Sequence, residues 1–240
     1  MTTVPVSGGG APAFSGAARL GLMGGTFNPV HLGHLRAAEE LSEYLGLDRV
    51  VFMPARQPPH KPGQNLAAFG HRLTMLNLAV EGQPIFRVSD LEGTLPGPSY
   101  TRNTLLEVAA RMDPGGELFF MVGFDSFRTV PHWHRGRELM ALASFSVFRR
   151  PGLGSELSSV QDVLSGFLGP PEEIRVDPAG RGGTLIFPNA RPVHYFAECL
   201  LEISSTDLRH RLDQGSSVRY LVPEEVRRYI AENALYHNNG

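Results

Sequence analysis

The chain has 240 residues, of which 42% are hydrophobic and 19% are charged, so it fits one globular domain and is neither disordered nor a coiled coil. Lysine and arginine total 22 against 24 for aspartate and glutamate, and the net charge of −2 gives no general attraction to nucleic acid or to an anionic membrane. We therefore expect no nucleic-acid or membrane partner, and any anion site must be local.

The N-terminal segment, residues 1–18, carries no charged side chain and is rich in glycine, proline, serine and alanine. It lacks the basic start and the apolar core of a signal peptide, so the sequence predicts a flexible tail. No apolar run approaches the roughly 20 residues that a membrane helix requires. The one cysteine, Cys199, has no partner for an internal disulfide, which favours a reducing cytosol and a cytoplasmic location.

Strand-like and helix-like segments alternate after the tail. Residues 19–23, 34–46 and 49–55 predict a strand, a helix and a second strand, because apolar residues in the middle segment keep helical spacing. The same alternation continues through 72–80, 86–92, 100–112, 117–125, 135–143 and 144–150.

This alternation predicts an α/β fold, a Rossmann-like, doubly wound parallel sheet in three layers (α/β/α), with ligands at the carboxyl ends of the strands. Segments 203–215 and 223–236 predict two closing helices, which form a small C-terminal helical part. Residues 151–183 are rich in glycine and proline around one possible short helix. We interpret them as a variable excursion within a single domain that spans 19–240.

A glycine turn follows the first predicted strand. Gly24 and Gly25 have no Cβ, so their backbone amides can approach a phosphate closely. Phe27 and Pro29 would stiffen the turn.

Two histidines stand at the start of the helix that follows the turn. His31 and His34 are one turn apart and point roughly the same way, and Gly33 between them leaves room for a ligand. Three interpretations remain open for this stretch: a purely structural turn, a pair of zinc ligands, or a clamp in which imidazoles donate hydrogen bonds to phosphate. Zinc lacks a nearby third ligand in the sequence, and the motif is not HExxH.

The motifs of the chain resemble those of a known group of enzymes. GGTFNPVHLGH, residues 24–34, is similar to the nucleotidylyltransferase superfamily signature GxFxPxHxGH, and ISSTDLR, residues 203–209, is similar to its second motif, ISSTxxR. Four further segments resemble one member family, the nicotinate-nucleotide adenylyltransferases: PPHKP at 58–62, GPSYT at 97–101, GFD at 123–125 and PHWHR at 131–135. These motifs stand in the family order across about residues 19–236.

The resemblance implies transfer of the adenylyl group of ATP to nicotinate mononucleotide, giving nicotinate adenine dinucleotide and pyrophosphate in NAD biosynthesis. Mg²⁺ is expected as the cofactor because it bridges triphosphate oxygens, but no carboxylate stands out as its ligand. The sequence does not indicate the oligomeric state.

Candidate ATP-binding residues come from three motifs. We expect His34 and His31 to be catalytic together with Arg209, and Ser204 or Ser205 to cap a helix whose free amides face an anion. Asp125 either caps a helix or, as the resemblance implies, holds the adenosine side; the neighbouring Phe124 departs from the Ala or Pro that is frequent in the family. The ATP set is Gly24, Gly25, Thr26, Phe27, His31, His34, Asp125, Ser204, Ser205, Thr206 and Arg209.

Candidate mononucleotide-binding residues follow the later strands. Arg56 and Lys61 stand in a proline-stiffened loop, where they are either solvated charges or cations that face a phosphate. Ser99 is expected to cap a helix that starts near Tyr100, so that the amides of Thr101 and Arg102 receive the nicotinate carboxylate. The resemblance implies that Trp133 stacks on the pyridine ring. The neighbouring His132 and His134 are interpreted as surface residues.

Three other functions compete with this one. The first is another adenylyltransferase or cytidylyltransferase of the superfamily, one that acts on nicotinamide mononucleotide or phosphopantetheine. The second is a nucleotide-binding module without catalysis, which the paired histidines and Arg209 disfavour. The third is a metal-dependent hydrolase that uses His31 and His34 as ligands.

Overall fold

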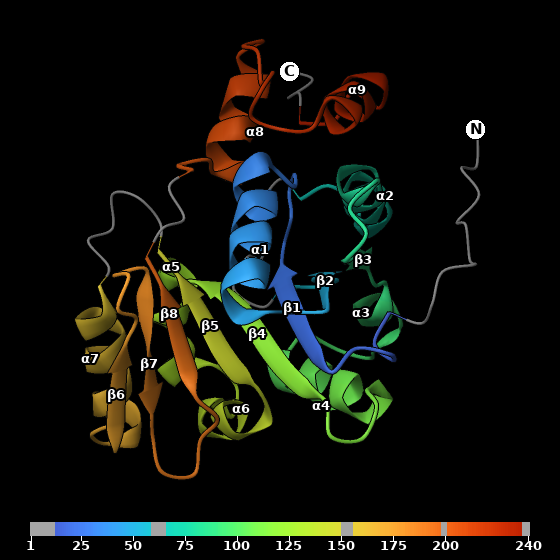
Figure 1. The fold of residues 1–240 in the computed structure, drawn as a ribbon. Coiled ribbons are helices and arrows are strands. Elements are labelled where there is room, and N and C mark those ends of the chain that lie inside the picture. Colours follow the sequence, from blue (N-terminus) through green and yellow to red (C-terminus); the bar gives the residue numbers. More distant parts are fainter. Residues whose placement is uncertain (1–12, 59–65, 150–155, 198–200, 237–240) are drawn as a thin grey trace.

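The computed structural model describes residues 13–58, 66–149, 156–197 and 201–236. Its centre is an eight-stranded sheet with the strand order β3-β2-β1-β4-β5-β8-β7-β6 (Figure 1). The strands are β1 (Arg19–Gly25), β2 (Arg49–Pro54), β3 (Phe86–Val88), β4 (Glu117–Gly123), β5 (Ser144–Phe148), β6 (Glu173–Val176), β7 (Gly182–Ile186) and β8 (Val193–Phe196). Six of them, from β3 to β8 in the sheet order, run parallel, and β7 is antiparallel to both β8 and β6.

Helices cover both faces of the sheet. They are α1 (Leu32–Leu45), α2 (Phe69–Val80), α3 (Leu91–Thr94), α4 (Thr101–Arg111), α5 (Phe124–Phe127), the 3-10 turn η1 (Val130–His132), α6 (Gly136–Leu142), α7 (Leu157–Leu168), α8 (Ser205–Asp213) and α9 (Glu224–Glu232). One core lies under α4, α6 and α7, and the other lies under α1, α2, α8 and α9. The predicted three-layer α/β fold with a small C-terminal helical part is therefore confirmed.

The cores follow from the sequence pattern of the strands. The central strands β1, β4 and β5 are almost fully buried, as expected for parallel strands that are covered on both faces. Side chains that alternate along β4 serve both cores: Phe120 and Val122 face one, and Phe119 and Met121 face the other. The C-terminal helices α8 and α9 lie beyond one end of α1, at the top of Figure 1.

The predicted flexible tail is too long. Phe14 and Ala17 are buried in the core that lies under α4, and the N–H of Gly16 donates to Oδ2 of Asp113 at 2.6 Å. Burial of the Phe14 ring stabilises the segment that leads into β1. The charge and composition of the segment do not reveal this contribution. Residues 1–12 lie outside the described residues.

The variable excursion expected at 151–183 stays a prediction, but where the structure describes this segment it is more regular than its composition suggests. It contributes α7 and the strand β6 and leads into β7, so the sheet is mixed and not wholly parallel. Gly182 and Gly183 made β7 hard to predict, because glycine is unfavourable in a strand. Here both glycines are needed, since other groups approach the backbone closely. A Cβ on Gly182 would lie 2.0 Å from the carbonyl oxygen of Tyr195, and one on Gly183 would lie 2.7 Å from Leu157.

Membrane spans and cellular location are separate points. Across the described ranges of the chain, no helix is both long and apolar enough to cross a membrane. The expectation of a reducing, cytoplasmic setting rests on Cys199, which lies outside the described residues, and it stays a prediction.

Candidate active site

The main cavity of the described structure has a volume of about 1100 Å³ and lies at the carboxyl ends of β1, β4 and β5. Gly25 at the end of β1, Gly123 at the end of β4 and Phe148 at the end of β5 all line it, together with the first residues of α4 and α8. The polar motifs of the sequence therefore meet at one edge of the sheet, as the parallel topology predicts.

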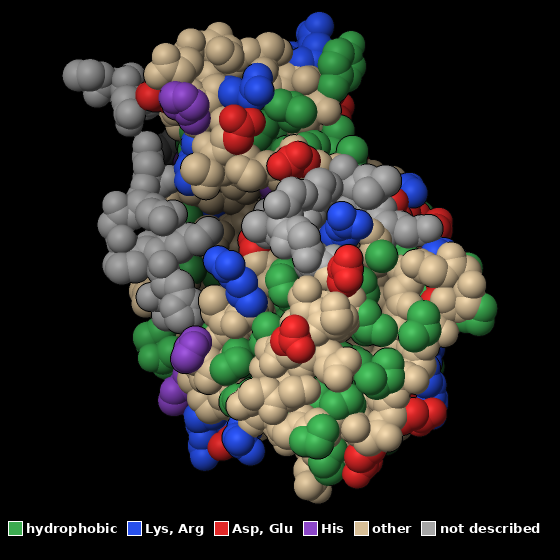
Figure 2. All heavy atoms as spheres, turned by 90° about the vertical axis from the view of Figure 1, so that its left-hand side faces the viewer, with side chains coloured by type: hydrophobic (Ala, Val, Ile, Leu, Met, Phe, Trp, Pro, Cys, Tyr) green, Lys and Arg blue, Asp and Glu red, His purple; other side chains and the backbone are tan. Residues whose placement is uncertain are grey.

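The net charge of the chain gives the cavity no general attraction for anions. On the face shown in Figure 2, acidic and basic side chains are interspersed, in keeping with the small net charge of the chain. Any preference for a polyanion must come from oriented amides and imidazoles in the cavity itself.

The glycine turn is tighter than its sequence suggests. Strand β1 continues to Gly25, where a Cβ would lie 3.1 Å from the ring of Phe27. Phe27 is 2% exposed and has a φ of +48°, which a residue with a side chain rarely adopts. The turn is therefore held in a strained shape by a buried aromatic ring.

The two histidines form a stacked pair. Their ring centroids are 3.7 Å apart, and the ring of Phe27 packs edge-on against His34 at 5.0 Å. His31 is the N-cap of α1 and is 2% exposed, whereas His34 is less buried and both line the cavity. Nδ1 of His34 accepts from the N–H of His31 at 3.3 Å, so the proton of a neutral His34 ring lies on Nε2.

Gly33 has a different role from the one expected. A Cβ at this position would lie 3.1 Å from Nδ1 of His31 and 3.5 Å from the side chain of Ile203. The missing side chain makes room for the ring of His31.

The start of α8 closes the same end of the cavity. Ser204 is the N-cap, and its Oγ accepts from the N–H of Asp207 at 3.1 Å, as predicted for one of the two serines. Ser205 instead donates its hydroxyl to the carbonyl of Pro29 at 2.9 Å, which ties the helix to the glycine turn. Ser204, Ser205 and Thr206 all line the cavity.

Arg209 forms hydrogen bonds with both the glycine turn and α8. Its Nη1 donates to the carbonyl of Asn28 at 2.8 Å and to that of Ser205 at 3.1 Å, and its Nη2 donates to Oγ1 of Thr206 at 3.2 Å. Arg209 is not among the residues that line the cavity. Its bonds join α8 to the turn that follows β1.

The predicted cap of α4 is wrong. The helix begins at Thr101 with Tyr100 as its N-cap, and the hydroxyl of Ser99 accepts the N–H of Gln57 at 3.1 Å. The loop after β2 competes for that hydroxyl, a contact that no local pattern reveals. Thr101 still lines the cavity at the start of the helix, where the first amides of an α-helix have no partner within it.

Arg56 and Lys61, predicted as cations that face a phosphate, and Arg102, predicted to act through its amide, have different environments. The side chain of Arg102 donates to Glu138 at 2.6 Å outside the cavity lining, and this bond lowers the pKa of the Glu138 carboxyl. Arg56 is exposed and donates to the carbonyl of Gly93 at 3.1 Å. Lys61 lies outside the described residues.

Trp133 and Asp125 both line the cavity. The indole of Trp133 is partly buried against the core, with its Nε1 donating to Oγ1 of Thr129 at 2.9 Å and its ring edge-on to Phe120 at 6.3 Å. Asp125 stands in the first turn of α5, directly after β4. These contacts hold the indole of Trp133 in place as part of the cavity lining.

Comparison with known proteins identifies the family. The cytidylyltransferase-like family model matches residues 22–211. A probable nicotinate-nucleotide adenylyltransferase of Pelobacter propionicus is 40% identical over 220 residues, covering 91% of this chain and 98% of the relative. One from Citrifermentans bemidjiense is 42% identical over 218 residues, with the same coverage. The chain belongs to the nicotinate-nucleotide adenylyltransferase family. It is accordingly an ATP-using nucleotidyltransferase.

Solved structures share the fold of this adenylyltransferase. The nicotinic acid mononucleotide adenylyltransferase of Plasmodium falciparum, complexed with NaAD, has a TM-score of 0.64 at 17% identity and covers 91% of this chain and 97% of its own. A putative nicotinate-nucleotide adenylyltransferase of Vibrio parahaemolyticus has a TM-score of 0.57 at 17% identity, with 92% and 96% covered. At this identity the likeness establishes the common architecture.

Sequence reasoning missed part of the adenylyltransferase cavity. His132 and His134 are exposed, as expected for surface residues, but they also line the cavity, and the ring of His134 stacks on Tyr100 at 4.4 Å. Glu92 also lines it, and its Oε1 accepts the hydroxyl proton of Thr104 at 2.6 Å. A lone glutamate on the four-residue helix α3 carries no signal of burial, so the sequence could not have singled it out.

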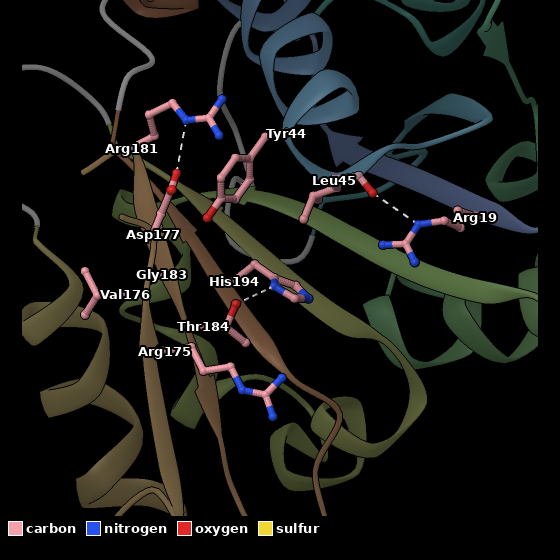
Figure 3. A pocket seen from close by; sticks show the side chains of 10 residues that line it. All are labelled: Arg19, Tyr44, Leu45, Arg175, Val176, Asp177, Arg181, Gly183, Thr184 and His194. Carbon is pink, nitrogen blue, oxygen red and sulfur yellow. Dashed lines mark hydrogen bonds and ion pairs between the residues drawn. The ribbon is translucent and has the colours of Figure 1, made fainter. Parts of the chain in front are cut away.

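A second concavity, of about 370 Å³, lies between β6, β7 and β8 on one side and the last turn of α1 and the start of β1 on the other (Figure 3). Arg19 of β1, Arg175 of β6 and Arg181 line it, and each forms an ion pair with an acidic neighbour. Tyr44 from the last turn of α1 also faces it. Because these arginines already have carboxylate partners, we place no step of the reaction here.

Metal-ligating side chains do not form a cage in the described part of the adenylyltransferase. No group of three or more histidine, cysteine, aspartate or glutamate residues there could hold a metal ion. His31 and His34 thus stand without a third candidate ligand among those residues.

Proposed function

We propose that the main cavity transfers the adenylyl group of ATP to nicotinate mononucleotide. A phosphate oxygen of the mononucleotide attacks the α-phosphorus of ATP, a new P–O bond forms, and the bond to the departing pyrophosphate breaks. The products are nicotinate adenine dinucleotide and pyrophosphate, an intermediate of NAD biosynthesis and its by-product. The observation that carries this proposal is the meeting of the stacked histidines, the glycine turn and the capped start of α8 at one end of a cavity whose other end holds Trp133 and the start of α4.

The reaction needs no general base. A phosphate monoester has a second pKa of about 6, so the attacking group is already mostly dianionic at neutral pH. The obstacles are repulsion between anions and the charge that grows on the α-phosphate and on the leaving group. Positioning and electrostatic stabilisation therefore carry the catalysis.

His34 is the residue that we assign to the α-phosphate. Its Nε2 carries the proton of the neutral ring, since Nδ1 accepts from the backbone of His31, and it can therefore donate to a phosphoryl oxygen without first becoming charged. His31 is more buried, and we assign it to the same phosphates and to holding the ring of His34 in place.

The triphosphate end is completed by backbone amides. We assign the turn residues Gly24, Gly25, Thr26 and Phe27 and the start of α8 to the ATP phosphates, because the free amides at a helix start attract anions. Arg209 supports this end through Asn28 and Ser205, and its remaining N–H groups could reach a phosphate. Asp125 is assigned to the adenosine side.

Mg²⁺ fits this site as a companion of the triphosphate. It needs few protein ligands, which agrees with a cavity whose described part contains no metal-binding cluster. When bound, it would neutralise charge between the phosphate oxygens. Asp125 and Glu92 are acidic residues of the cavity lining, and neither is assigned as a ligand.

The mononucleotide end is assigned to Trp133 and the start of α4. The indole wall would stack on the pyridine ring, and the amides of Thr101 and Arg102 would receive its carboxylate. Arg56 and Lys61 are assigned to the mononucleotide phosphate, with Lys61 outside the described residues. Arg102 contributes its amide, since its side chain is held by Glu138.

Pyrophosphate release with two mononucleotides tests the proposal. We expect kcat/KM with ATP to favour nicotinate mononucleotide over nicotinamide mononucleotide by at least about a hundredfold. The NH₂ group of the nicotinamide would face the backbone N–H groups at the start of α4, and two hydrogen-bond donors cannot pair. Trp133→Ala should raise KM for the mononucleotide far more than KM for ATP. Equal efficiency with both mononucleotides would contradict the acid-specific assignment, and no release with either would remove the proposed reaction.

A further inference from the structure

Arg72 on α2 is the largest fully buried side chain of the described residues, and no step of the proposed reaction uses it. It is 1% exposed, although arginine is rarely buried to this extent. We propose that Arg72 is a positioning residue, which holds the glycine turn in the shape that binds the ATP phosphates. This inference rests on the proposed function.

The guanidinium gathers three segments of the chain. Its Nη1 donates to the carbonyl of Thr26 at 2.8 Å, its Nε to that of Ala67 at 3.0 Å, and its Nη2 to that of Arg56 at 3.5 Å. Thr26 belongs to the turn after β1, Arg56 follows β2, and Ala67 precedes α2. A planar fork of five donors can hold several carbonyls at fixed angles, which a lysine ammonium on a flexible stem cannot reproduce.

The shortest of these bonds acts on the strained part of the turn. Thr26 directly precedes Phe27, whose φ of +48° has to be enforced by its surroundings. In a trans peptide the C=O and the N–H point in opposite directions, so fixing the Thr26 carbonyl toward α2 turns the N–H of Phe27 to the far side of the turn. Thr26 and Phe27 both line the cavity.

The bond from Arg72 to Thr26 also affects the histidine pair, because the ring of the next residue, Phe27, contacts His34. Phe27 packs edge-on against His34, with centroids 5.0 Å apart. A turn that relaxes at Thr26 would therefore move both the phosphate-facing amides and the surface on which His34 rests. Such displacements of about 1 Å can cost roughly a hundredfold in rate even when the substituted residue is remote from the chemistry.

The charge of Arg72 also favours an anion on the turn. Burial lowers the pKa of Arg72, but the pKa of a guanidinium is so high that the group stays protonated, and the buried carboxylate Glu92 attracts it. The ring of Phe69 lies 5.6 Å from its central carbon on the same helix. A fixed cation thus lies directly behind the turn, in a region from which water is excluded.

Two substitutions and one matched control test this role. Arg72→Met keeps the apolar stem and removes all three carbonyl bonds, and Arg72→Lys keeps the charge but replaces the fork by a single ammonium. Met75→Ala is the control, because Met75 is a fully buried residue of the same helix and its truncation should destabilise the fold without touching the turn. The measurements are calorimetric affinity for a non-hydrolysable ATP analogue, KM for ATP and for the mononucleotide, kcat, and the thermal midpoint.

We expect Arg72→Met to weaken binding of the ATP analogue and to raise KM for ATP by about tenfold or more, with a further loss in kcat. KM for the mononucleotide should change much less, since the contact with the Arg56 loop is the longest of the three. Arg72→Lys should recover part of the loss, and Met75→Ala should lower the thermal midpoint while KM for ATP stays within about twofold.

The inference is overturned if folded Arg72→Met binds the ATP analogue and uses ATP within about twofold of the unchanged chain. If Arg72→Met does not fold, the same criterion applied to Arg72→Lys decides. If the chain without substitutions releases no pyrophosphate, the proposed reaction is contradicted. The affinity for the ATP analogue would still test whether Arg72 positions the glycine turn.

Discussion

The imidazole rings of His31 and His34 lie stacked with their centroids 3.7 Å apart, and His31 is the more buried of the two. Stacking fixes the plane of the His34 ring, and the bond from the backbone of His31 fixes its tautomer. The two histidines therefore act together, because His31 fixes the orientation of the His34 ring and the position of its N–H donor.

Removal of the donor should affect turnover more than binding. We expect His34→Ala to lower kcat by about two to three orders of magnitude, the usual loss when one preorganised transition-state donor is removed, with a smaller rise in KM for ATP. Steady-state pyrophosphate release at saturating ATP measures this. Near-normal kcat in a folded His34→Ala protein would remove His34 from the mechanism.

The glycine between the histidines offers a milder probe. Gly33→Ala places a Cβ 3.1 Å from Nδ1 of His31, so the ring must shift by a few tenths of an ångström. We expect kcat to fall by about tenfold while the thermal midpoint changes little.

Gly70→Ala is the matched control for that substitution. A Cβ on Gly70 of α2 meets nothing within 4 Å, and alanine favours a helix by up to about 1 kcal/mol over glycine. Its kcat should equal that of the unchanged chain. If both alanine variants keep full kcat, the packing of His31 against Gly33 does not limit the reaction.

Arg209 gives a test of how α8 supports the phosphate end. Arg209→Ala removes bonds to the carbonyls of Asn28 and Ser205 from a partly exposed side chain, so the fold should survive. We expect KM for ATP to rise by about tenfold or more, and Arg209→Lys to restore only part of it. The check is ATP titration with circular dichroism on the same samples; unfolding with unchanged ATP kinetics would make Arg209 a purely structural residue.

The sequence predicted the elements that carry a strong period and the motifs at their ends. Strands β1, β2, β4 and β5 and helices α1 and α4 were expected within a few residues of where they lie, because buried parallel strands and amphipathic helices leave a local pattern. The topology then placed the glycine turn, the histidines and the start of α8 around one cavity, as expected.

What the sequence could not predict depends on contacts between distant segments. Ser99 was expected to cap α4, but Gln57, which follows β2, takes its hydroxyl. The glycine-rich run 151–183 suggested an excursion, but its last two residues, Gly182 and Gly183, lie in β7, where neighbouring groups leave no space for a Cβ. Nothing in the sequence singles out Arg72, and only its contact with the assembled turn explains its burial. Local propensity does not contain these partners.

The last prediction concerns His194 on β8, which faces the second concavity (Figure 3). Its Nδ1 is hydrogen-bonded to Oγ1 of Thr184 at 3.0 Å, and burial, with a smaller effect of the charge on Arg19, lowers its pKa to about 4 from the ordinary value of 6.5. Between these two values the unfolded chain takes up a proton that the folded chain refuses. The free energy of unfolding therefore falls as the pH drops from about 6.5 to about 4, and His194 adds no further pH dependence outside that window.

This dependence should be large enough to measure by urea unfolding. From pH 7 to pH 5, His194 should cost the folded state about 2 kcal/mol, and His194→Gln, which keeps a partner for Thr184 but does not titrate, should lose that much less stability over the same interval. The difference between the two chains isolates His194 from the other histidines, since those titrate in both. Equal losses in the two chains would show that His194 takes up its proton as readily in the folded state as in the unfolded one.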